Sequence, residues 1–372
     1  MVRDGSRGAG EAARIAIILH DFAPGGTERI IVRLANHWAA TGRDVAILCG
    51  SEAGPARSLV SPAVAVRAPL RPTPQSSRSR ARLARRLVPL ITDFTPDVIV
   101  GPGNYHLPML ATLAHCELAT PIVAKLSNPL ERSDLNVLQH ALFAWRKRSL
   151  VRRIDLLVAM SGALAAEAAR TLGGSAIAIQ PEPIVEHAER IAPRRTSAPR
   201  LLVAGRLVVQ KRVALAIAAF AAWDRPDARL TIAGDGEERG KLELLAGKLK
   251  VMDRVAFVGL QDGLAYCFAH HDLLLSTSTF EGFPATLVEA IVAGLPVVAT
   301  PSSVALPEIF AHESFGRIVA ADPQAIAAAL EAQWLAGEVD EAARRALAAR
   351  HDATASASGW LGMLDQLVAK TR

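Results

Sequence analysis

The chain has 372 residues, and because one domain usually holds about 100–200 residues, this length predicts two domains. Hydrophobic residues make up 51% of the chain and charged residues 21%, which excludes an intrinsically disordered protein. The apolar runs are far shorter than the ~20 residues that a membrane-spanning helix needs. The polar first residues lack the apolar core of a signal peptide. The three cysteines are scattered and predict neither a disulfide framework nor a zinc site. We therefore expect a cytoplasmic protein.

Short apolar runs alternate with helix-length patterns along the first half. The runs predict strands at 15–19, 45–48, 64–68, 98–100, 122–124, 156–159 and 176–179. The longer stretches predict helices at 28–40, 78–94, 134–150 and 163–172. Strands that are apolar on both faces and separated by helices indicate a parallel sheet that is covered on both sides.

The pattern stops at residues 186–200, which are polar, contain two prolines and are predicted to form an interdomain linker. It then restarts, and the predicted strands are 201–204, 230–233, 255–258, 273–276 and 297–299. The predicted helices are 213–223, 237–250, 285–293, 323–335 and the Ala-rich stretch 341–368. This alternation predicts an α/β protein of two doubly wound domains, the first at 1–185, with 1–13 disordered, and the second at 201–350.

Positive charge is concentrated in the first half. Residues 1–198 carry 25 Lys and Arg against 16 Asp and Glu, whereas 199–372 carry 17 against 20, and the net charge of the chain is +6. Between 67 and 86 there are seven arginines and no acid, and a second acid-free basic cluster lies at 146–153 among apolar residues. Such segments suit anionic lipid headgroups or nucleic acid, and a solvated helix face is the alternative. The candidates for membrane contact are Arg78, Arg82, Arg85, Arg86, Trp145, Arg146, Lys147 and Arg148.

A glycine pair follows the first predicted strand, and ligands of open α/β sheets bind beyond the carboxyl ends of strands. Gly25 and Gly26 precede a helical pattern, and the unpaired amides at such a helix start suit a phosphate. An ordinary tight turn is the alternative. The sequence contains neither a Gly-x-Gly-x-x-Gly fingerprint nor a P-loop, which argues against NAD chemistry and P-loop NTP hydrolysis.

Two cations follow the first predicted strand of the second half. Arg206 comes directly after Gly205, and Lys211 lies five residues further on, where a helix is predicted to start. Such a pair can converge on one diphosphate, because arginine offers a fork of donors and lysine a point charge. Surface cations that keep a loop soluble are the alternative.

The most specific feature is the segment 276–290, which reads STSTFEGFPATLVEA. Glu281 lies in a loop after a predicted strand, residues 282–284 form a tight turn, and Glu289 lies one to two turns into the following helix. Carboxylates accept hydrogen bonds from hydroxyl groups and backbone amides donate to them, so this set suits a hydroxyl-rich ligand such as a sugar.

In order and spacing, these motifs resemble the retaining glycosyltransferases of family 4, which have the two-domain GT-B fold. The resemblance covers nearly the whole chain, and its motifs are Gly25-Gly26-Thr27-Glu28, Gly205-Arg206-Leu207 with Lys211, Ala233-Gly-Asp-Gly-Glu237, Phe257-Val-Gly259, Glu281-Gly-Phe-Pro284 and 289–298. It implies two Rossmann-like domains that face a central cleft, and a C-terminal helix at 351–372 that returns to the N-terminal, acceptor-binding domain. The chain looks most similar to bacterial enzymes that extend lipid-linked or cell-surface polysaccharides.

The resemblance also implies roles for the donor-site residues. Arg206 and Lys211 would hold the donor diphosphate, and Glu281, the third implied catalytic residue, would bind the donor sugar. Glu289 would bind the ribose and Gly259 would lie beside the base. The implied donor site consists of Gly25, Gly26, Gly205, Arg206, Lys211, Gly259, Glu281, Gly282, Phe283, Pro284, Ala285 and Glu289.

Substrates and partners follow from the same resemblance. The implied donor is a nucleotide diphosphate sugar, with UDP favoured, and neither a metal nor another cofactor is required. The implied acceptor is a glycan or a polyprenyl-linked glycan, reached from the cytoplasm at the anionic inner face of the cell membrane, and no nucleic acid partner is expected. A non-hydrolysing nucleotide-sugar epimerase and an inactive GT-B scaffold protein are the alternatives.

Two positions depart from the family pattern. The strand that ends at Lys125 is often followed in related enzymes by a histidine at the acceptor, and here Leu126-Ser127-Asn128 follows. The asparagine that many members place before a proline is absent from 180–183. Candidate acceptor contacts are Asn104, His106, Ser127 and Asn128, and a structural role is the alternative for the lone histidine.

Overall fold

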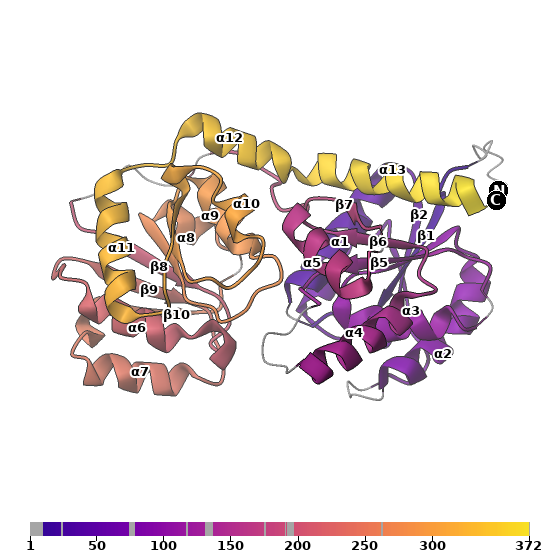
Figure 1. The fold of residues 1–372 in the computed structure, drawn as a ribbon, viewed down its shortest axis with the longest axis horizontal. Coiled ribbons are helices and arrows are strands. Elements are labelled where there is room, and N and C mark those ends of the chain that lie inside the picture. Colours follow the sequence, from indigo (N-terminus) through magenta and orange to yellow (C-terminus); the bar gives the residue numbers. More distant parts are fainter. Residues whose placement is uncertain are drawn as a thin grey trace. The chain divides into compact units, whose positions relative to one another are not determined.

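The chain folds into two compact units, drawn in Figure 1. The computed structural model describes residues 10–371 except 24, 74–78, 117, 131–136, 175, 190, 192–196 and 262. The first unit comprises Met1–Pro183 with Ala353–Arg372, and the second comprises Ile184–Asp352. Within the segment that we expected to be disordered, residues 1–9 lie outside the described residues, whereas Ala12 is buried. Of the expected linker, residues 190 and 192–196 lie outside them, and its described residues belong to the second unit.

The described part of the first unit contains a seven-stranded parallel sheet in the order β3-β2-β1-β4-β5-β6-β7. Its strands are β1 (Arg14–Leu19), β2 (Asp44–Cys49), β3 (Ala65–Arg67), β4 (Val98–Gly101), β5 (Ile122–Leu126), β6 (Leu156–Ala159) and β7 (Ala178–Ile179). Alternate residues of β1 face opposite sides, because successive side chains of a strand point to opposite faces. Ile15 and Ile17 belong to one core, and Ala16 and Ile18 to the other.

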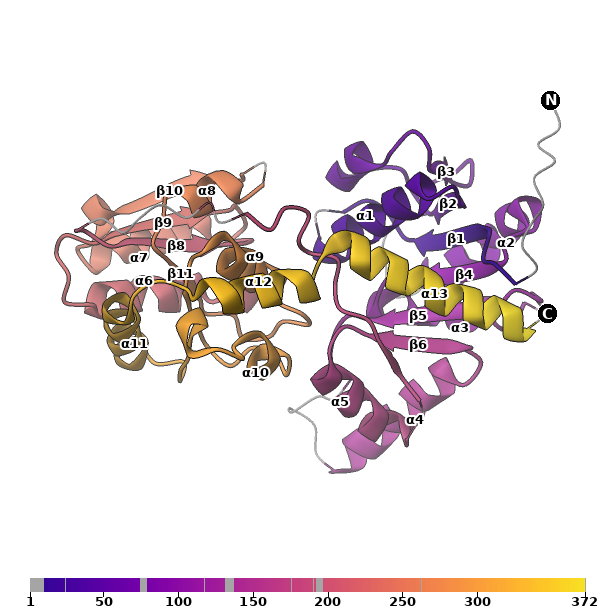
Figure 2. The same cartoon turned by 90° about the horizontal axis from the view of Figure 1, so that it is seen from above.

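Helices cover both faces of this sheet, which is why its strands are apolar throughout. α1 (Gly26–Ala40) and α13 (Ala353–Thr371) pack together on one face, as Figure 2 shows. The other face carries α2 (Ser79–Phe94), α3 (Leu107–Leu113), α4 (Val137–Val151) and α5 (Gly162–Leu172). These helices confirm the predicted doubly wound arrangement of the first half.

The C-terminal helix returns to the first unit, as expected. Trp360 of α13 is fully buried against Trp38 of α1, with ring centroids 6.3 Å apart, and the Trp38 indole N–H donates to the Ala357 carbonyl at 3.1 Å. The predicted single helical stretch 341–368 is two helices, α12 (Glu341–Arg350) and α13. The break coincides with the passage of the chain from the second unit to the first, which composition alone does not reveal.

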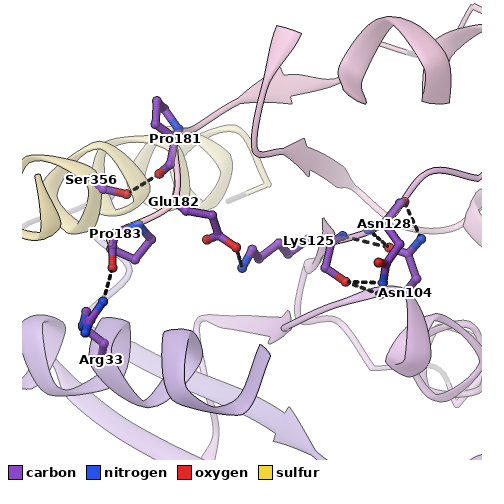
Figure 3. A network of polar contacts seen from close by, with 9 residues as sticks. Arg33, Asn104, Lys125, Asn128, Pro181, Glu182, Pro183 and Ser356 are labelled. Carbon is purple, nitrogen blue, oxygen red and sulfur yellow. Dashed lines mark hydrogen bonds and ion pairs between the residues drawn. The ribbon is translucent and has the colours of Figure 1, made fainter. Parts of the chain in front are cut away.

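The segment from which the chain leaves the first unit is anchored on three sides, as Figure 3 shows. Glu182 forms a buried ion pair with Lys125 of β5, with Nζ and Oε1 2.6 Å apart. The carbonyls on either side of Glu182 accept hydrogen bonds from Ser356 Oγ of α13, at 2.6 Å, and from the Arg33 guanidinium of α1, at 2.7 Å. Replacing Lys125 or Glu182 alone would leave the other as an uncompensated buried charge, which typically costs about 3–5 kcal/mol.

The described part of the second unit contains a six-stranded parallel sheet in the order β10-β9-β8-β11-β12-β13. Its strands are β8 (Arg200–Ala204), β9 (Arg229–Ala233), β10 (Val255–Gly259), β11 (Leu273–Ser276), β12 (Val297–Ala299) and β13 (Gly316–Ile318). The sequence did not predict β13, because two of its three residues are exposed and it has no apolar run. The helices besides α12 are α6 (Val213–Ala222), α7 (Arg239–Lys248), α8 (Ala265–Ala269), α9 (Ala285–Ala293), α10 (Leu306–Ile309) and α11 (Pro323–Ala336).

Both sheets reverse their strand order at one point. In the first unit the reversal lies between β1 and β4, and in the second it lies between β8 and β11. Ligands of open α/β sheets bind beyond the carboxyl ends of the strands at such a switch point. The loops after these four strands are therefore the places at which to look for function. In the part of the chain that the structure describes, no helix is both long enough and apolar enough to cross a membrane.

Candidate functional site

The loops after β8 and β11 bring together two of the residues predicted to bind the donor. Lys211 lies at the end of a short helical turn that begins at Val209, and Glu281 lies five residues after β11. The Lys211 ammonium and a Glu281 carboxylate oxygen are 2.5 Å apart, and both side chains are partly exposed. Arg206, in the loop directly after β8, is exposed, and its guanidinium forms no hydrogen bond or ion pair with the described residues. The structure thus places a cation and a carboxylate in contact at the switch point.

Arg212, which the sequence analysis did not single out, braces the two loops. Its backbone is left-handed, with φ 44° and ψ 43°, a conformation that costs a residue other than glycine about 1–2 kcal/mol. Its guanidinium donates to the carbonyls of Thr277 and Ser278, at 2.9 and 3.2 Å, and to Thr300 Oγ1 at 3.3 Å. The side chain therefore offsets the backbone strain by fastening the loop after β11 to the turn that carries Lys211.

Further hydrogen bonds join the same two loops. The amide of Thr279 donates to the carbonyl of Gln210 at 2.8 Å, and the Gln210 side chain donates to the carbonyl of Phe280 at 2.6 Å. Thr277 Oγ1 donates to the carbonyl of Lys211 at 3.1 Å. Because these bonds surround Lys211 and Glu281, the contact between their side chains belongs to a rigid frame.

The turn after Glu281 presents backbone donors. The Glu281 amide donates to the Ser302 carbonyl at 2.6 Å, and Ser303 Oγ donates to the Gly282 carbonyl at 2.6 Å. The amides of Gly282 and Phe283 have no acceptor among the described residues. The positive end of α9, which begins at Ala285, lies just beyond them, so this turn suits an electronegative ligand atom.

Other predicted donor contacts lie around this turn. Pro284 precedes the first residue of α9, and Glu289 is half-buried on the second turn of that helix. The Phe283 ring packs against His351, with ring centroids 5.3 Å apart. The segment 281–289 therefore forms one continuous turn and helix start.

Three glycines end three neighbouring strands of the second sheet: Gly205 after β8, Gly234 after β9 and Gly259 in β10. The Gly234 amide donates to the Gly259 carbonyl at 2.8 Å, and Gly234 has φ 147°. A Cβ atom at position 234 would lie 1.9 Å from the Gly205 carbonyl oxygen, so only glycine fits there. Because glycine has no side chain, the ends of β8, β9 and β10 present only backbone atoms at these three positions next to Arg206.

The predicted acceptor residues lie in the first unit, on the loops after β4 and β5. The Asn104 side chain accepts from the Ser127 amide at 2.8 Å and donates to the Asn128 carbonyl at 2.7 Å (Figure 3). These bonds fasten the two loops to each other. Their contact with an acceptor stays a prediction. Gly25 and Gly26 also lie in this unit, as the residue before α1 and its first residue.

His106, the fourth predicted acceptor residue, is 1% exposed. Its Nε2 accepts from the backbone amide of His20 at 3.3 Å, which connects the loop after β4 to the end of β1. Burial, together with the proximity of His20, lowers the pKa of His106 to about 3, so the ring is neutral at pH 7. This placement indicates that His106 holds the strand ends in position.

The basic segments of the first unit differ in how far they are available. On α2, Arg82 and Arg85 are exposed, whereas Arg86 donates to Thr73 Oγ1 at 2.6 Å. Arg78 lies outside the described residues. The expectation of membrane contact on α2 therefore rests on Arg82 and Arg85.

On α4 the exposed side chains mix cations with an aromatic ring. Trp145 is 65% exposed, and Arg146 and Arg148 beside it are also exposed. Lys147 is half-buried, with its Nζ 5.0 Å from the centre of the Phe143 ring. A cavity of about 560 Å³ lies at the amino end of β6, and its lining consists of Trp145, Arg148, Ser149, Val151, Arg152, Ile154, Asp155, Leu157, Leu172 and Ala176.

No group of three or more His, Cys, Asp or Glu side chains that could hold a metal ion occurs within the described ranges.

Two family models match the chain, one on each unit. Residues 25–183 match the model "Glycosyl transferase 4-like domain", and residues 186–351 match "Glycosyl transferases group 1". Together these matches include the Lys211–Glu281 contact of the second unit and the loops after β4 and β5 of the first unit.

Curated proteins are similar to parts of this chain that differ in length. A GDP-mannose-dependent alpha-mannosyltransferase of Mycolicibacterium smegmatis is 27% identical over 317 residues, which cover 77% of this chain and 79% of that protein. An N-acetylgalactosamine-N,N'-diacetylbacillosaminyl-diphospho-undecaprenol 4-alpha-N-acetylgalactosaminyltransferase of Campylobacter jejuni is 30% identical over 122 residues, 33% of each chain. Several further curated relatives match over 28% or less of their own length.

Solved structures share the fold. Anabaena Alr3699/HepE, in complex with UDP-glucose, superposes with a TM-score of 0.72 at 21% identity, and the match covers 96% of this chain and 98% of that one. The two α/β units are therefore those of the GT-B fold.

The brace by Arg212 predicts an order of stabilities. Arg212→Gly removes the side-chain hydrogen bonds but relieves the left-handed backbone, whereas Arg212→Ala removes the bonds and keeps the strain. We expect the wild type to be most stable, the Gly variant to lose about 1–3 kcal/mol, and the Ala variant to lose about 1 kcal/mol more. Urea unfolding followed by tryptophan fluorescence measures this, and an Ala variant as stable as the Gly variant would contradict the account.

Proposed function

Because the chain belongs to the group 1, GT4-type glycosyltransferases, we propose that it moves a sugar from a UDP-sugar to a hydroxyl group of a lipid-linked or cell-surface glycan, with retention of the anomeric configuration. The observation that carries the proposal is the contact of Lys211 with Glu281. In a nucleotide sugar the terminal phosphate is bonded directly to the anomeric carbon. A cation for the phosphate and a carboxylate for the sugar must therefore lie side by side, as these two residues do.

The proposed roles follow from the chemistry of each group. Arg206 and Lys211 hold the diphosphate, and the positive end of α9 adds to their field. Glu281 and the amides of Gly282 and Phe283 bind the sugar hydroxyls, since a carboxylate accepts from hydroxyl groups and an amide donates to them. Glu289 binds the ribose, and Gly259 lies beside the base.

The proposed reaction takes place on one face of the donor sugar. A bond forms between the acceptor oxygen and the anomeric carbon, while the bond from that carbon to the diphosphate oxygen breaks and leaves its electron pair on the diphosphate. The acceptor proton passes to the departing phosphate oxygen. The chain supplies positioning and positive charge where negative charge develops, and no side chain is required as a nucleophile.

The names of similar proteins support the choice of substrates. The Campylobacter jejuni relative is named for an undecaprenol-linked acceptor, and the HepE structure holds UDP-glucose. A lipid-linked acceptor also suits the exposed basic surface of the first unit, defined here as Arg82, Arg85, Trp145, Arg146, Arg148, Arg152 and Arg153. Because α2 and α4 cover the same face of the first sheet, we propose that this surface attaches the protein peripherally to an anionic membrane.

The diphosphate role of Lys211 predicts a loss of turnover. Lys211→Ala should lower acceptor-dependent release of UDP about 10²–10³-fold, because removing one preorganised donor to developing charge has that effect. Lys241→Ala is the matched control, since Lys241 lies on α7 and its side chain is 75% exposed. Wild-type turnover in the Lys211 variant would remove this residue from the mechanism, and sugar isomerisation without acceptor would favour an epimerase.

Membrane attachment predicts salt-dependent binding to vesicles. Each cation near an anionic surface contributes about 1 kcal/mol, and screening shortens from ~10 Å at 0.1 M salt to ~3 Å at 1 M. The protein should co-sediment with anionic but not neutral vesicles, release at high salt, and lose binding when Arg146, Arg148 and Arg152 are replaced by Gln. The control replaces Lys241, Lys248 and Lys250, which are exposed on the second unit, by Gln. Equal binding to neutral vesicles, or equal loss in the control, would refute this surface.

A further inference from the structure

The cavity at the amino end of β6 lies on the edge of the first sheet that is opposite to the carboxyl ends of its strands. Its volume is about 560 Å³, which is within the range of about 300–1,000 Å³ that is usual for small-molecule sites. β6 has four residues, and at about 3.3 Å per residue it separates the cavity from the other edge by about 13 Å. A ligand held here is therefore distinct from an acceptor at the loops after β4 and β5.

The end of α4 forms one wall of this cavity, beside α5 (Figure 2). The residues of this wall are Trp145, Arg148, Ser149 and Arg152. Their spacing of three, four and seven positions places them on one side of the helix and of the turn that follows it, because a helix turns once every 3.6 residues. Arg146 and Arg153 are exposed and lie outside the lining. The basic cluster is thus divided into cations that line the cavity and cations that do not.

The two lining arginines have donors to offer to a ligand. Arg148 Nε donates to the Thr171 carbonyl at the end of α5, at 3.1 Å, which holds this guanidinium in place. Within the described ranges, Nη1 and Nη2 of Arg148 and the whole guanidinium of Arg152 have no hydrogen-bond or ion-pair partner. Because a guanidinium donates two parallel hydrogen bonds to phosphate oxygens, two such groups on one wall suit a phosphate.

A carboxylate on another side of the cavity limits the charge of the ligand. Asp155 Oδ2 accepts from the Ile122 amide at 2.7 Å, and its Oδ1 accepts no hydrogen bond from the residues that the structure describes. Two guanidinium groups and one carboxylate give the lining a net charge of +1, which complements the single negative charge of a phosphodiester. The open carboxylate oxygen suits a hydroxyl group close to that phosphate.

The rest of the lining is apolar. Val151, Leu157 and Leu172 are buried beneath the cations, and Trp145 is 65% exposed beside them. A tryptophan ring with one apolar side and one polar N–H is typical of the interface between a membrane and water. A free phosphate would leave these apolar side chains in water, whereas the glycerol ester end of a phospholipid covers them. The lining therefore favours a lipid headgroup over a free phosphate.

We propose that this cavity binds the headgroup of a single anionic phospholipid that carries hydroxyl groups, such as phosphatidylglycerol. Arg148 and Arg152 donate to its phosphate, Asp155 accepts from a headgroup hydroxyl, and Trp145 lies beside the glycerol esters. The proposal rests on the membrane attachment proposed above and adds selection of one lipid class to it. A general attraction between basic and anionic surfaces does not require such a site.

The test titrates the full chain with dihexanoyl phosphatidylglycerol below the concentration at which it forms micelles. Of the five tryptophans, all of which the structure describes, Trp145 alone is exposed, so tryptophan emission reports on this cavity. Emission of the wild type should shift to shorter wavelength and saturate. Arg148→Gln and Arg152→Gln should each weaken binding about tenfold to a hundredfold, the usual effect of losing hydrogen bonds of a charged group. Ala176→Phe, which narrows the cavity and keeps every charge, should weaken it as well.

Arg146→Gln and Arg153→Gln are the matched controls, because each removes the same charge next to the cavity and leaves the lining intact. They should weaken binding of the monomeric lipid less than about threefold, since a charge outside the cavity acts through water. The proposal is overturned by the absence of a saturable shift in the wild type, or by equal weakening in the lining and control variants. Binding of dihexanoyl phosphatidylcholine or of inorganic phosphate as tightly as the phosphatidylglycerol overturns it too.

Vesicles of phosphatidylglycerol separate this proposal from the attachment on which it rests. Sedimentation with these vesicles that all four arginine variants reduce equally keeps the attachment and refutes the headgroup site. Binding of the monomeric lipid in the expected pattern, without sedimentation with vesicles, refutes the attachment and supports the site.

Discussion

The contact between the Lys211 ammonium and the Glu281 carboxylate depends on one topological constraint. The two residues are 70 positions apart, and they meet because β8 and β11 are neighbours in a sheet whose strand order reverses between them. Parallel strands send the loops that follow them to one edge, so the sheet order decides which loops can meet. Hydrogen bonds of Arg212, Gln210 and Thr277 then hold the loops after β8 and β11 in a fixed arrangement.

The two units present different chemistry at their carboxyl edges. The second offers cations, backbone amides and carboxylates, which suit a diphosphate bonded to a sugar. In the first, the Asn104 side chain joins the loops after β4 and β5, and the buried His106 ring connects to the end of β1. The excess positive charge of the first unit lies elsewhere, on α2 and around α4. The positive net charge of this unit therefore comes from those helices and not from the loops at the carboxyl ends of its strands.

The sequence predicted the features that local patterns encode. Apolar runs predicted each strand described in the first unit. Lys211 and Glu281, which the sequence analysis placed after two strands of the second unit, are in contact, and their roles toward a donor stay predictions. It missed β13 because three residues without an apolar run carry no signal. It also treated Arg86 as free for a membrane, although the Arg86 guanidinium of α2 donates to Thr73 Oγ1, because a bond between a helix and a distant loop leaves no trace in composition.

The remaining omissions share one physical cause. The left-handed backbone of Arg212 and the orientation of Asp21 by His20 arise from contacts with loops that the fold brings close. The polar pair His20 and Asp21 directly after β1 was visible in the sequence, and only the fold shows that His20 is buried there with Nδ1 3.0 Å from Asp21 Oδ2. Patterns with the period of a helix or strand carry no information about such distant partners.

The central claim is that the second unit holds a nucleoside diphosphate through its two phosphates. Calorimetric titration of the full chain with UDP and with uridine tests it most directly, because the two ligands share the base and ribose. Two charge-assisted hydrogen bonds contribute about 1.5–3 kcal/mol each, so UDP should bind at least about 100-fold more tightly than uridine. Equal affinity for UDP and uridine, or no measurable binding of UDP, would contradict the account.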